Sequence, residues 1–501
     1  MYRVDSDLFS TASPSLNDAE IASRFQASNS LDGYDEDDEG YDEDGEGDEG
    51  DDDDDDDEEG PRSIFHLSTP EHYVLSTALK TRVLVFGVAF LATSMVGTYD
   101  SSSSLLSPNH NYHPMFLCPS NWDGAFHVKI ASERGYLYEQ SHAFFPLFPL
   151  VMAVTQQLGY WLTLHGGFNL DDLVVMGLAG TAVNTILFLA ASVLFYRLSS
   201  KVFDSGLGKR RHRNIAMRAS ILFCFNPASI FFSVAYSESL FTVFALAGML
   251  LLQPAVTGGR KRQRKRQRQR RVANVGGGVV DFKHRMLASL CFAGATLTRS
   301  NGSLLGLFSL YAAWRAYDKG KQTNRTLTTH VLQLAAVTAV HGSALLTVLG
   351  HGWFKYCWNK GVRRPWCDYT VPNIYSFVQA EYWNLGLFSY YEMKQLPNFL
   401  VAFPAVALCV GALVRYWKEG ERGTGIPPPF ALQMILSLLI AASVMHIQVF
   451  TRFICSSAPM FYWHAAVLTQ RETGIAYFVL LYFTFFLLLG TSMFCSYFPW
   501  T

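Results

Sequence analysis

The sequence lacks a cleavable signal peptide and a metal-binding cysteine pattern. The N-terminus is polar and then acidic, and the first apolar run comes only after residue 80, so we expect that run to be an uncleaved anchor. None of the eight cysteines stands in a C-x-x-C motif, which argues against zinc. Cys357 and Cys367 fall in one polar segment and could pair if it faces an oxidising compartment. No internal repeat, a common feature of transporters, is visible.

Nearly half of the acidic residues lie in one short segment of the chain. Residues 35–59 hold 20 of the 42 acidic residues, which leaves 22 acidic against 40 basic residues elsewhere. Such a segment repels itself and cannot bury a core, so we expect residues 1–79 to be a disordered, acidic, cytoplasmic tail. A docking or metal-binding role for the tail stays open. The basic run 260–271 has no aromatic residues interspersed, so the surrounding loop 257–283 is expected to set topology or contact anionic lipid, and not to bind nucleic acid.

Apolar runs dominate the remainder of the chain, which is 50% hydrophobic overall. Runs of about 15 to 25 residues are what spanning helices require. They predict an all-α polytopic membrane domain over residues 80–501 with about 9–11 membrane helices. The runs are 82–98, 144–164, 173–197, 216–233, 238–255, 285–316, 328–349, 397–416, 428–449, 453–469 and 474–495. Two are ambiguous: 144–164 is expected to be interfacial or re-entrant, and 285–316 is interrupted at 298–302.

The basic clusters set the expected orientation. Short cytoplasmic loops collect Lys and Arg, which places the clusters 209–213 and 260–271 in the cytoplasm. Two long segments, 99–142 and 350–396, then lie on the far side of the membrane, and both are rich in Trp, Tyr and Phe. Loops of that length are uncommon unless they carry function. We therefore expect the working surface on that side.

The first of these segments carries a candidate general base. Asp123 stands beside Trp122, just after the first apolar run, and has no Asp-x-Asp partner in its loop. A positioned carboxylate can take a proton from an attacking group. An isolated loop Asp is more commonly a turn or cap residue, so this pair alone does not identify a reaction.

A collinear series of motifs surrounds the Trp-Asp pair and continues to the end of the chain. Its segments are 122–131, 135–139, 143–150, 226–229, 235–241, 299–302, 365–367, 372–376, 382–384, 386, 390–392, 395–399, 446–449, 451–453 and 499–500. Together they resemble the GPI mannosyltransferase 2 family over about residues 80–501. The acidic tail and the basic insert look like additions to the family pattern. The family usually has His directly before the Trp-Asp pair, where this chain has Asn121.

The resemblance implies a GT-C-type glycosyltransferase of the endoplasmic reticulum membrane with a luminal active site. Its donor would be dolichyl-phosphate mannose, and its acceptor a mannosyl-glucosaminyl-phosphatidylinositol that receives an α-1,6-linked second mannose. No cofactor is expected, metal dependence is left open, and there is room for an accessory membrane subunit. A lipid or sugar transporter and a non-catalytic subunit of a membrane complex are the alternatives.

The chemistry assigns roles to a few residues. A β-linked donor and an α-linked product need one inverting displacement, for which Asp123 would be the base. The departing phosphate needs cationic compensation, and Arg452 and Arg299 are the candidates because ionisable residues between apolar runs commonly serve function. Either arginine could instead pair with a carboxylate such as Glu238, which is itself a candidate acceptor contact.

Aromatic residues of the two polar segments are candidates for substrate contact. Trp122 adjoins the base, and four residues of the second segment could stack on sugar faces. The alternative for these four is an interfacial aromatic belt. They are Trp366, Tyr375, Tyr382 and Trp383.

Overall fold

The computed structural model describes residues 67–96, 113–165, 170–203, 209–254, 280–320, 327–358, 363–470 and 473–498. All of these belong to one compact unit, Phe65–Thr501. Most of the predicted acidic tail and basic loop lie outside the described residues, so their predicted roles stay predictions.

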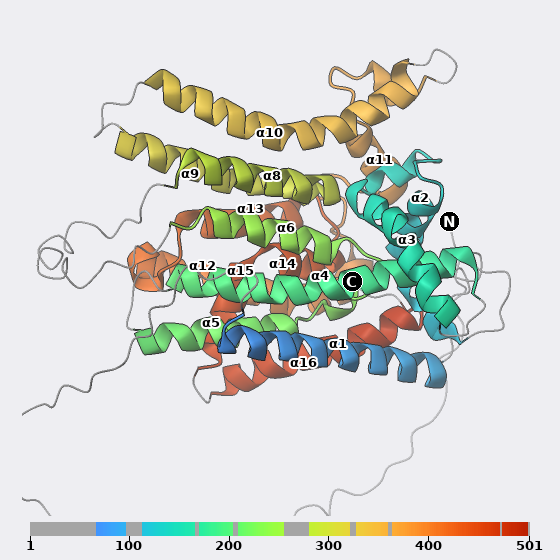
Figure 1. Cartoon of the computed structure of the whole chain (residues 1–501), viewed down its shortest axis with the longest axis horizontal. Helices are drawn as coiled ribbons and strands as arrows, with labels where there is room; N and C mark the ends of the chain where they lie inside the picture. Colours follow the sequence, from blue (N-terminus) through green and yellow to red (C-terminus); the bar gives the residue numbers. More distant parts are fainter. Residues whose placement is uncertain are drawn as a thin grey trace, which may run out of the picture. The chain divides into compact units, whose positions relative to one another are not determined.

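Every regular element in the described residues is helical (Figure 1). The long helices lie side by side: α1 packs against α4, α4 against α6, α6 against α8, and α8 against α10. The shorter helix α2 also packs against α4. The helices are α1 (Thr69–Met95), α2 (Asp123–Ser132), α3 (Leu147–His165), α4 (Asp172–Phe203), α5 (Lys209–Cys224), α6 (Glu238–Leu251), α8 (Phe282–Thr298), α9 (Gly306–Gly320), α10 (Leu327–Trp353), α11 (Ile374–Trp383), α12 (Leu396–Thr424), α13 (Pro428–Ser443), α14 (Phe450–Ser457), α15 (Pro459–Leu468) and α16 (Gly474–Cys495).

Short 3-10 turns connect many of these helices. They are η2 (Pro114–Phe116), η3 (Cys118–Ser120), η4 (Gln140–Ala143), η5 (Ser229–Phe232), η7 (Ser300–Leu305), η10 (Pro365–Asp368), η11 (Met393–Gln395) and η12 (Ile447–Val449), and a π-helical turn, η9 (Phe354–Trp358), extends α10. The described parts of the two predicted long polar segments, 113–142 and 350–396 without 359–362, are therefore largely helical. They hold η2, η3, α2 and η4 in the first, and η9, η10, α11 and η11 in the second.

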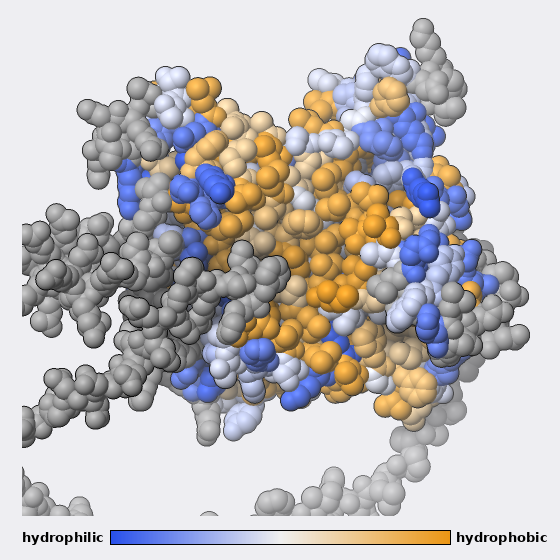
Figure 2. All heavy atoms as spheres, viewed as in Figure 1, coloured by the Kyte–Doolittle hydropathy of each residue, from blue (hydrophilic) through white to orange (hydrophobic). Residues whose placement is uncertain are grey.

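An apolar band crosses the middle of the molecule, and hydrophilic residues gather at its two ends (Figure 2). Within the described residues, five helical stretches are long and apolar enough to cross a membrane: 69–95, 172–203, 327–358, 393–424 and 474–495. Four shorter apolar helical stretches accompany them: 147–157, 214–224, 238–251 and 428–443. Apolar surface of this length is stable only in a bilayer, so the prediction of an all-α polytopic membrane protein is confirmed.

Two predicted boundaries need correction. Residues 69–79, which we predicted to be part of the tail, form the first turns of α1. The sequence carries a signal for this helix start, because Ser68 and Glu71 have the spacing of a helix-capping box. In the structure, the backbone N–H of Ser68 donates to Glu71 Oε2 at 2.7 Å. The predicted run 453–469 is two helices and not one. It begins within α14 and continues in α15, and the extended backbone of Ala458 separates the two helices.

The structure gives the secondary structure of the two ambiguous runs. The run 285–316 breaks where predicted: α8 ends at Thr298, Arg299 is extended, and η7 leads into α9. The run 144–164 forms α3, which packs against α2 and α4. Its depth in the membrane stays a prediction.

Candidate active site

A cavity of about 1010 Å³ lies where both predicted polar segments meet the helix ends. Its walls are mainly apolar and include a few charged and polar side chains, which is the usual composition of a ligand site. Residues from distant parts of the chain line it, including Trp122, Asp123, His127, Glu238, Arg299, Asn301, Tyr375, Trp383, His446, Gln448 and Arg452.

Asp123 is held at the start of α2 by two hydrogen bonds. Its backbone N–H donates to the hydroxyl of Tyr236 at 3.0 Å, and its Oδ2 accepts from Arg452 Nη2 at 2.8 Å. The residue before it, Trp122, has a φ of 54°, which is strained for a residue with a side chain. The Trp122 ring lies 5.2 Å from that of Tyr497. The backbone therefore turns sharply at Trp122, and the carboxylate of Asp123 reaches the cavity.

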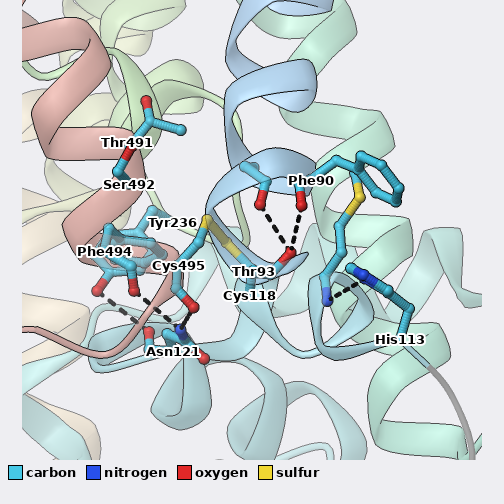
Figure 3. The surroundings of a disulfide bond; sticks show 12 residues. Phe90, Thr93, His113, Cys118, Asn121, Tyr236, Thr491, Ser492, Phe494 and Cys495 are labelled. Carbon is cyan, nitrogen blue, oxygen red and sulfur yellow. Dashed lines mark hydrogen bonds between the residues drawn. A yellow bond between two sulfur atoms is a disulfide. The ribbon is translucent and has the colours of Figure 1, made fainter. Parts of the chain in front are cut away.

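The segment just before Asp123 is fastened to the end of α16. Cys118 forms a disulfide with Cys495, across 377 positions of sequence. Asn121, which is 1% exposed, donates from Nδ2 to the carbonyl oxygens of Phe494 at 3.0 Å and Cys495 at 3.4 Å. Figure 3 shows the disulfide and the Asn121 amide on the same end of α16. Asn121 thus has a definite structural role at the position where the family pattern has His.

Arg452 lies on α14 close to two aromatic rings. Its guanidinium carbon is 5.2 Å from the ring centre of Phe231 and 5.7 Å from that of Tyr236, within the range of cation–π attraction. The side chain is 16% exposed and that of Asp123 is 27% exposed. Two candidates that we selected separately, a base and a phosphate ligand, therefore form one half-buried ion pair facing the cavity.

Arg299 and Glu238 form a second ion pair in the same cavity. Arg299 is the extended residue between α8 and η7, and Glu238 is the first residue of α6. The alternative in which one arginine pairs with Glu238 is thus realised by Arg299, whereas Arg452 pairs with Asp123. Both arginines keep cavity-facing positions.

His127 is a cavity residue that the sequence reasoning missed. It stands four residues after Asp123 on α2 and is 3% exposed. Burial, with the positive charges of Arg299 and Arg452, outweighs the opposing effect of Asp123 and lowers the pKa of His127 to about 3. The imidazole is neutral at neutral pH. The i, i+4 spacing from Asp123 was the available signal, since such residues share a helix face.

The four predicted stacking residues separate into two groups. Tyr375 and Trp383 line the cavity. Trp366 and Tyr382 do not belong to the described lining: Trp366 is 0% exposed, and its indole N–H donates to Glu139 Oε1 at 2.8 Å. The structure therefore does not bring Trp366 or Tyr382 to a sugar in this cavity.

Glu139 instead joins the two polar segments. Its carboxylate accepts from Arg364 Nε at 2.9 Å and from the Tyr382 hydroxyl at 3.0 Å, in addition to Trp366. Burial opposes ionisation, but these three hydrogen bonds outweigh it and lower the pKa of Glu139. The disulfide Cys357–Cys367 lies in the same segment as Arg364 and Trp366, and realises the pairing considered from the sequence.

His446 and Gln448 line the cavity and also pack against the second polar segment. The His446 ring stacks on Tyr390 at 4.5 Å, and the Tyr390 hydroxyl donates to Gln448 Oε1 at 3.2 Å.

No group of three or more His, Cys, Asp and Glu side chains suited to a metal ion occurs in the part of the chain that the structure describes.

Comparisons with known proteins agree on one family. The profile of the family described as mannosyltransferase (PIG-V) matches residues 72–422 and 428–501. GPI mannosyltransferase 2 of Drosophila pseudoobscura pseudoobscura is 29% identical over 410 residues, covering 76% of this chain and 86% of the relative. GPI alpha-1,6-mannosyltransferase 2 of Homo sapiens is 27% identical over 475 residues, covering 76% of this chain and 87% of the relative.

A solved structure of the Archaeoglobus fulgidus oligosaccharyltransferase is similar at a TM-score of 0.41 with 11% identity, covering 85% of this chain and 55% of that one. A likeness that distant says nothing about the reaction. The family profile spans most of the chain, including Asp123, Glu238, Arg299 and Arg452. This chain belongs to the mannosyltransferase (PIG-V) family.

Proposed function

We propose that this protein transfers mannose from dolichyl-phosphate mannose to the first mannose of a GPI-anchor precursor, forming the α-1,6-linked second mannose. The relatives' names support the transfer and the linkage. The observation that carries the proposal is the Asp123–Arg452 ion pair at 2.8 Å in a cavity of about 1010 Å³. It unites a proton acceptor and a phosphate-binding cation at one place.

The reaction is a single inverting displacement. The acceptor hydroxyl attacks the anomeric carbon, the bond from that carbon to the phosphate oxygen breaks, and dolichyl phosphate leaves with the electron pair. Asp123 takes the proton of the attacking hydroxyl, which removes charge from the developing oxonium. The leaving group departs as an anion and needs no proton, so a general acid is not required.

Arg452 stabilises the negative charge that develops on the phosphate. Its Nη2 contacts Asp123, while its Nε is buried and has no hydrogen-bond partner in the described part of the chain. A guanidinium can serve two anions because its five N–H groups point in several directions. An incoming phosphate competes with Asp123 for the positive charge, which leaves the carboxylate freer to accept a proton.

The cavity end of the molecule is proposed to face the lumen of the endoplasmic reticulum. The basic clusters 209–213 and 260–271 favour the cytoplasm, on the opposite side of the membrane in our topology. Two disulfides, Cys118–Cys495 and Cys357–Cys367, lie in or next to the cavity-forming segments, as expected in an oxidising compartment. A role for an accessory membrane subunit stays a prediction.

The test is rescue of cells that cannot add the second mannose, combined with transfer of labelled mannose in their microsomes. Rescue by the wild-type chain, and no rescue by an equally abundant Asp123→Asn variant, is expected. Binding of labelled donor without transfer would favour a transporter. Rescue by both chains would show that Asp123 is not the base. Rescue by a chain that transfers no mannose when purified would favour a non-catalytic subunit.

A further inference from the structure

Glu238 carries an unused carboxylate oxygen in the cavity. The residue is 0% exposed and lines the cavity at the first turn of α6. Its Oε1 pairs with Arg299, whereas its Oε2 is buried without a hydrogen-bond partner among the described residues. An ionised carboxylate oxygen only accepts hydrogen bonds, so its missing partner must be a donor.

Two other residues of the cavity lining have the same property. Asn301 lies in η7, two positions after Arg299, and both its Oδ1 and Nδ2 are buried without a partner in the described residues. Trp383, at the end of α11, has a buried indole N–H that is likewise unpartnered there. Buried polar groups in native proteins nearly always have a partner. Three residues in one cavity that lack one point to a ligand.

The pattern of donors and acceptors fits a sugar. Glu238 offers an acceptor, Asn301 a donor and an acceptor, and Trp383 a donor beside an aromatic face. The Trp383 ring stands edge-on to Phe126 at 5.7 Å and to Phe144 at 6.0 Å, so its position is fixed by packing. Sugar hydroxyls both donate and accept. A phosphate only accepts, and the free oxygen of Glu238 would repel it, whereas Arg452 would attract it.

We propose that Glu238, Asn301 and Trp383 form a subsite that binds a sugar of the acceptor glycan, while Arg452 serves the donor phosphate. The inference rests on the proposed transfer reaction. The same sugar chemistry could come from the donor's mannose. Separate KM measurements for the acceptor and for the donor distinguish these two sources.

Asn301→Ala is the most informative variant. The side chain makes no hydrogen bond to the described protein, so its loss should leave the thermal unfolding midpoint of the detergent-solubilised protein unchanged or raised. The KM for the acceptor should rise about 3- to 10-fold, as expected for a lost neutral hydrogen bond. The KM for dolichyl-phosphate mannose should stay within about twofold of wild type, since the donor does not use this group.

Ser437→Ala is the matched control. Ser437 on α13 is 0% exposed and its hydroxyl has no partner among the described residues, yet it is not part of the described cavity lining. Its removal should change neither KM. Trp383→Phe, which keeps a ring and loses the N–H, should raise the acceptor KM as Asn301→Ala does. Glu238→Gln should raise it more than tenfold, because bonds to charged groups are stronger.

The outcomes separate the proposal from the reaction on which it rests. An unchanged acceptor KM in Asn301→Ala and Trp383→Phe, with wild type fully active, would overturn the subsite. A rise in the donor KM alone would assign these residues to the donor's mannose and also overturn it. A fall in unfolding midpoint that accounts for the lost activity would make them structural. A wild-type chain that transfers no mannose would refute the proposed function instead.

Discussion

Arg452 Nη2 lies 2.8 Å from Asp123 Oδ2, although the two residues are 329 positions apart in the sequence. One comes from the start of α2 and the other from the short helix α14. The residues next to each of them in the sequence do not indicate that the two form an ion pair. The contact joins the base and the phosphate ligand of the proposed reaction, so a variant of either should affect the other.

Asp123→Asn should abolish most mannose transfer while the protein still inserts and accumulates. Asn keeps the shape of the side chain but cannot take a proton, and removing a general base costs about 10²- to 10⁴-fold in turnover. Turnover in microsomes, normalised to folded protein, is the measurement. Asp281→Asn is the control, because Asp281 caps α8 at His284 outside the described cavity lining, and Asn is an equally good cap. Near-normal turnover in Asp123→Asn would move the base elsewhere, with Glu238 next.

Arg452→Lys should be poorly tolerated. A planar fork can hold Asp123 and a phosphate together, whereas an ammonium offers a point charge on a shorter reach. We expect a raised KM for the donor and a fall in kcat of at least about tenfold. Arg363→Lys should be nearly silent, because Arg363 pairs with Asp368 where both side chains are more than half exposed, at 63% and 65%. Unchanged donor kinetics in Arg452→Gln would make Arg452 structural and leave Arg299 as the phosphate ligand.

Stability should fall as the pH drops below about 6.5, partly because of His142. This residue is 1% exposed and stacks on Tyr136 at 4.2 Å. Burial and the nearby His351 lower the pKa of His142 to about 4. The unfolded chain, with an ordinary His pKa, therefore binds the proton first, and stability is lost between pH 6.5 and 4, by at most about 3 kcal/mol.

His142→Phe keeps a ring in the stack and removes the titrating nitrogen. Its unfolding midpoint should be lower than that of wild type at pH 7.5, since the contact from Nδ1 to the Glu139 carbonyl at 3.2 Å is lost. Between pH 6.5 and 4, however, the midpoint should decline less steeply than in wild type. Equal slopes for the two proteins would show that His142 does not contribute to the acid sensitivity.

Engineered glycosylation acceptor sites should be modified in the segments 99–142 and 350–396 and not in 209–213 or 260–271. The reason is the bias of Lys and Arg toward short cytoplasmic loops. The measurement is a mobility shift that glycosidase treatment removes. Modification within either basic cluster would invert the topology and place the cavity on the cytoplasmic side.

The family resemblance led to Asp123, Arg452, Arg299 and Glu238 because their motifs are local in sequence. The pairing among them was only partly foreseen. Arg299 and Glu238 were considered as partners, but the pairing of Arg452 with Asp123 depends on how α2 and α14 pack. Tyr236, His127 and Asn301 fall within matching segments of the family pattern, but the sequence assigned them no role in the site. They enter the cavity because α6, α2 and η7 converge there.

Two aromatic residues that looked alike in the sequence have different positions in the structure. Trp366 and Trp383 both looked like candidates for sugar stacking, since both lie in one aromatic-rich segment. In the structure, Glu139 of the other segment accepts a hydrogen bond from Trp366 and buries it, while Trp383 is left facing the cavity. A sequence cannot say which indole will find a buried carboxylate, because that contact spans 227 positions.

The sequence by itself determined the class of protein and the chemistry of its residues. Apolar runs of bilayer length require helices, because a chain in lipid must satisfy its backbone hydrogen bonds within each segment. Those runs and the basic clusters depend on composition alone. Only the tertiary structure decided which charges meet, which cysteines pair across 377 positions and which polar groups are left unpartnered in the cavity. These contacts depend on distances between segments, and such distances are fixed only when the helices pack.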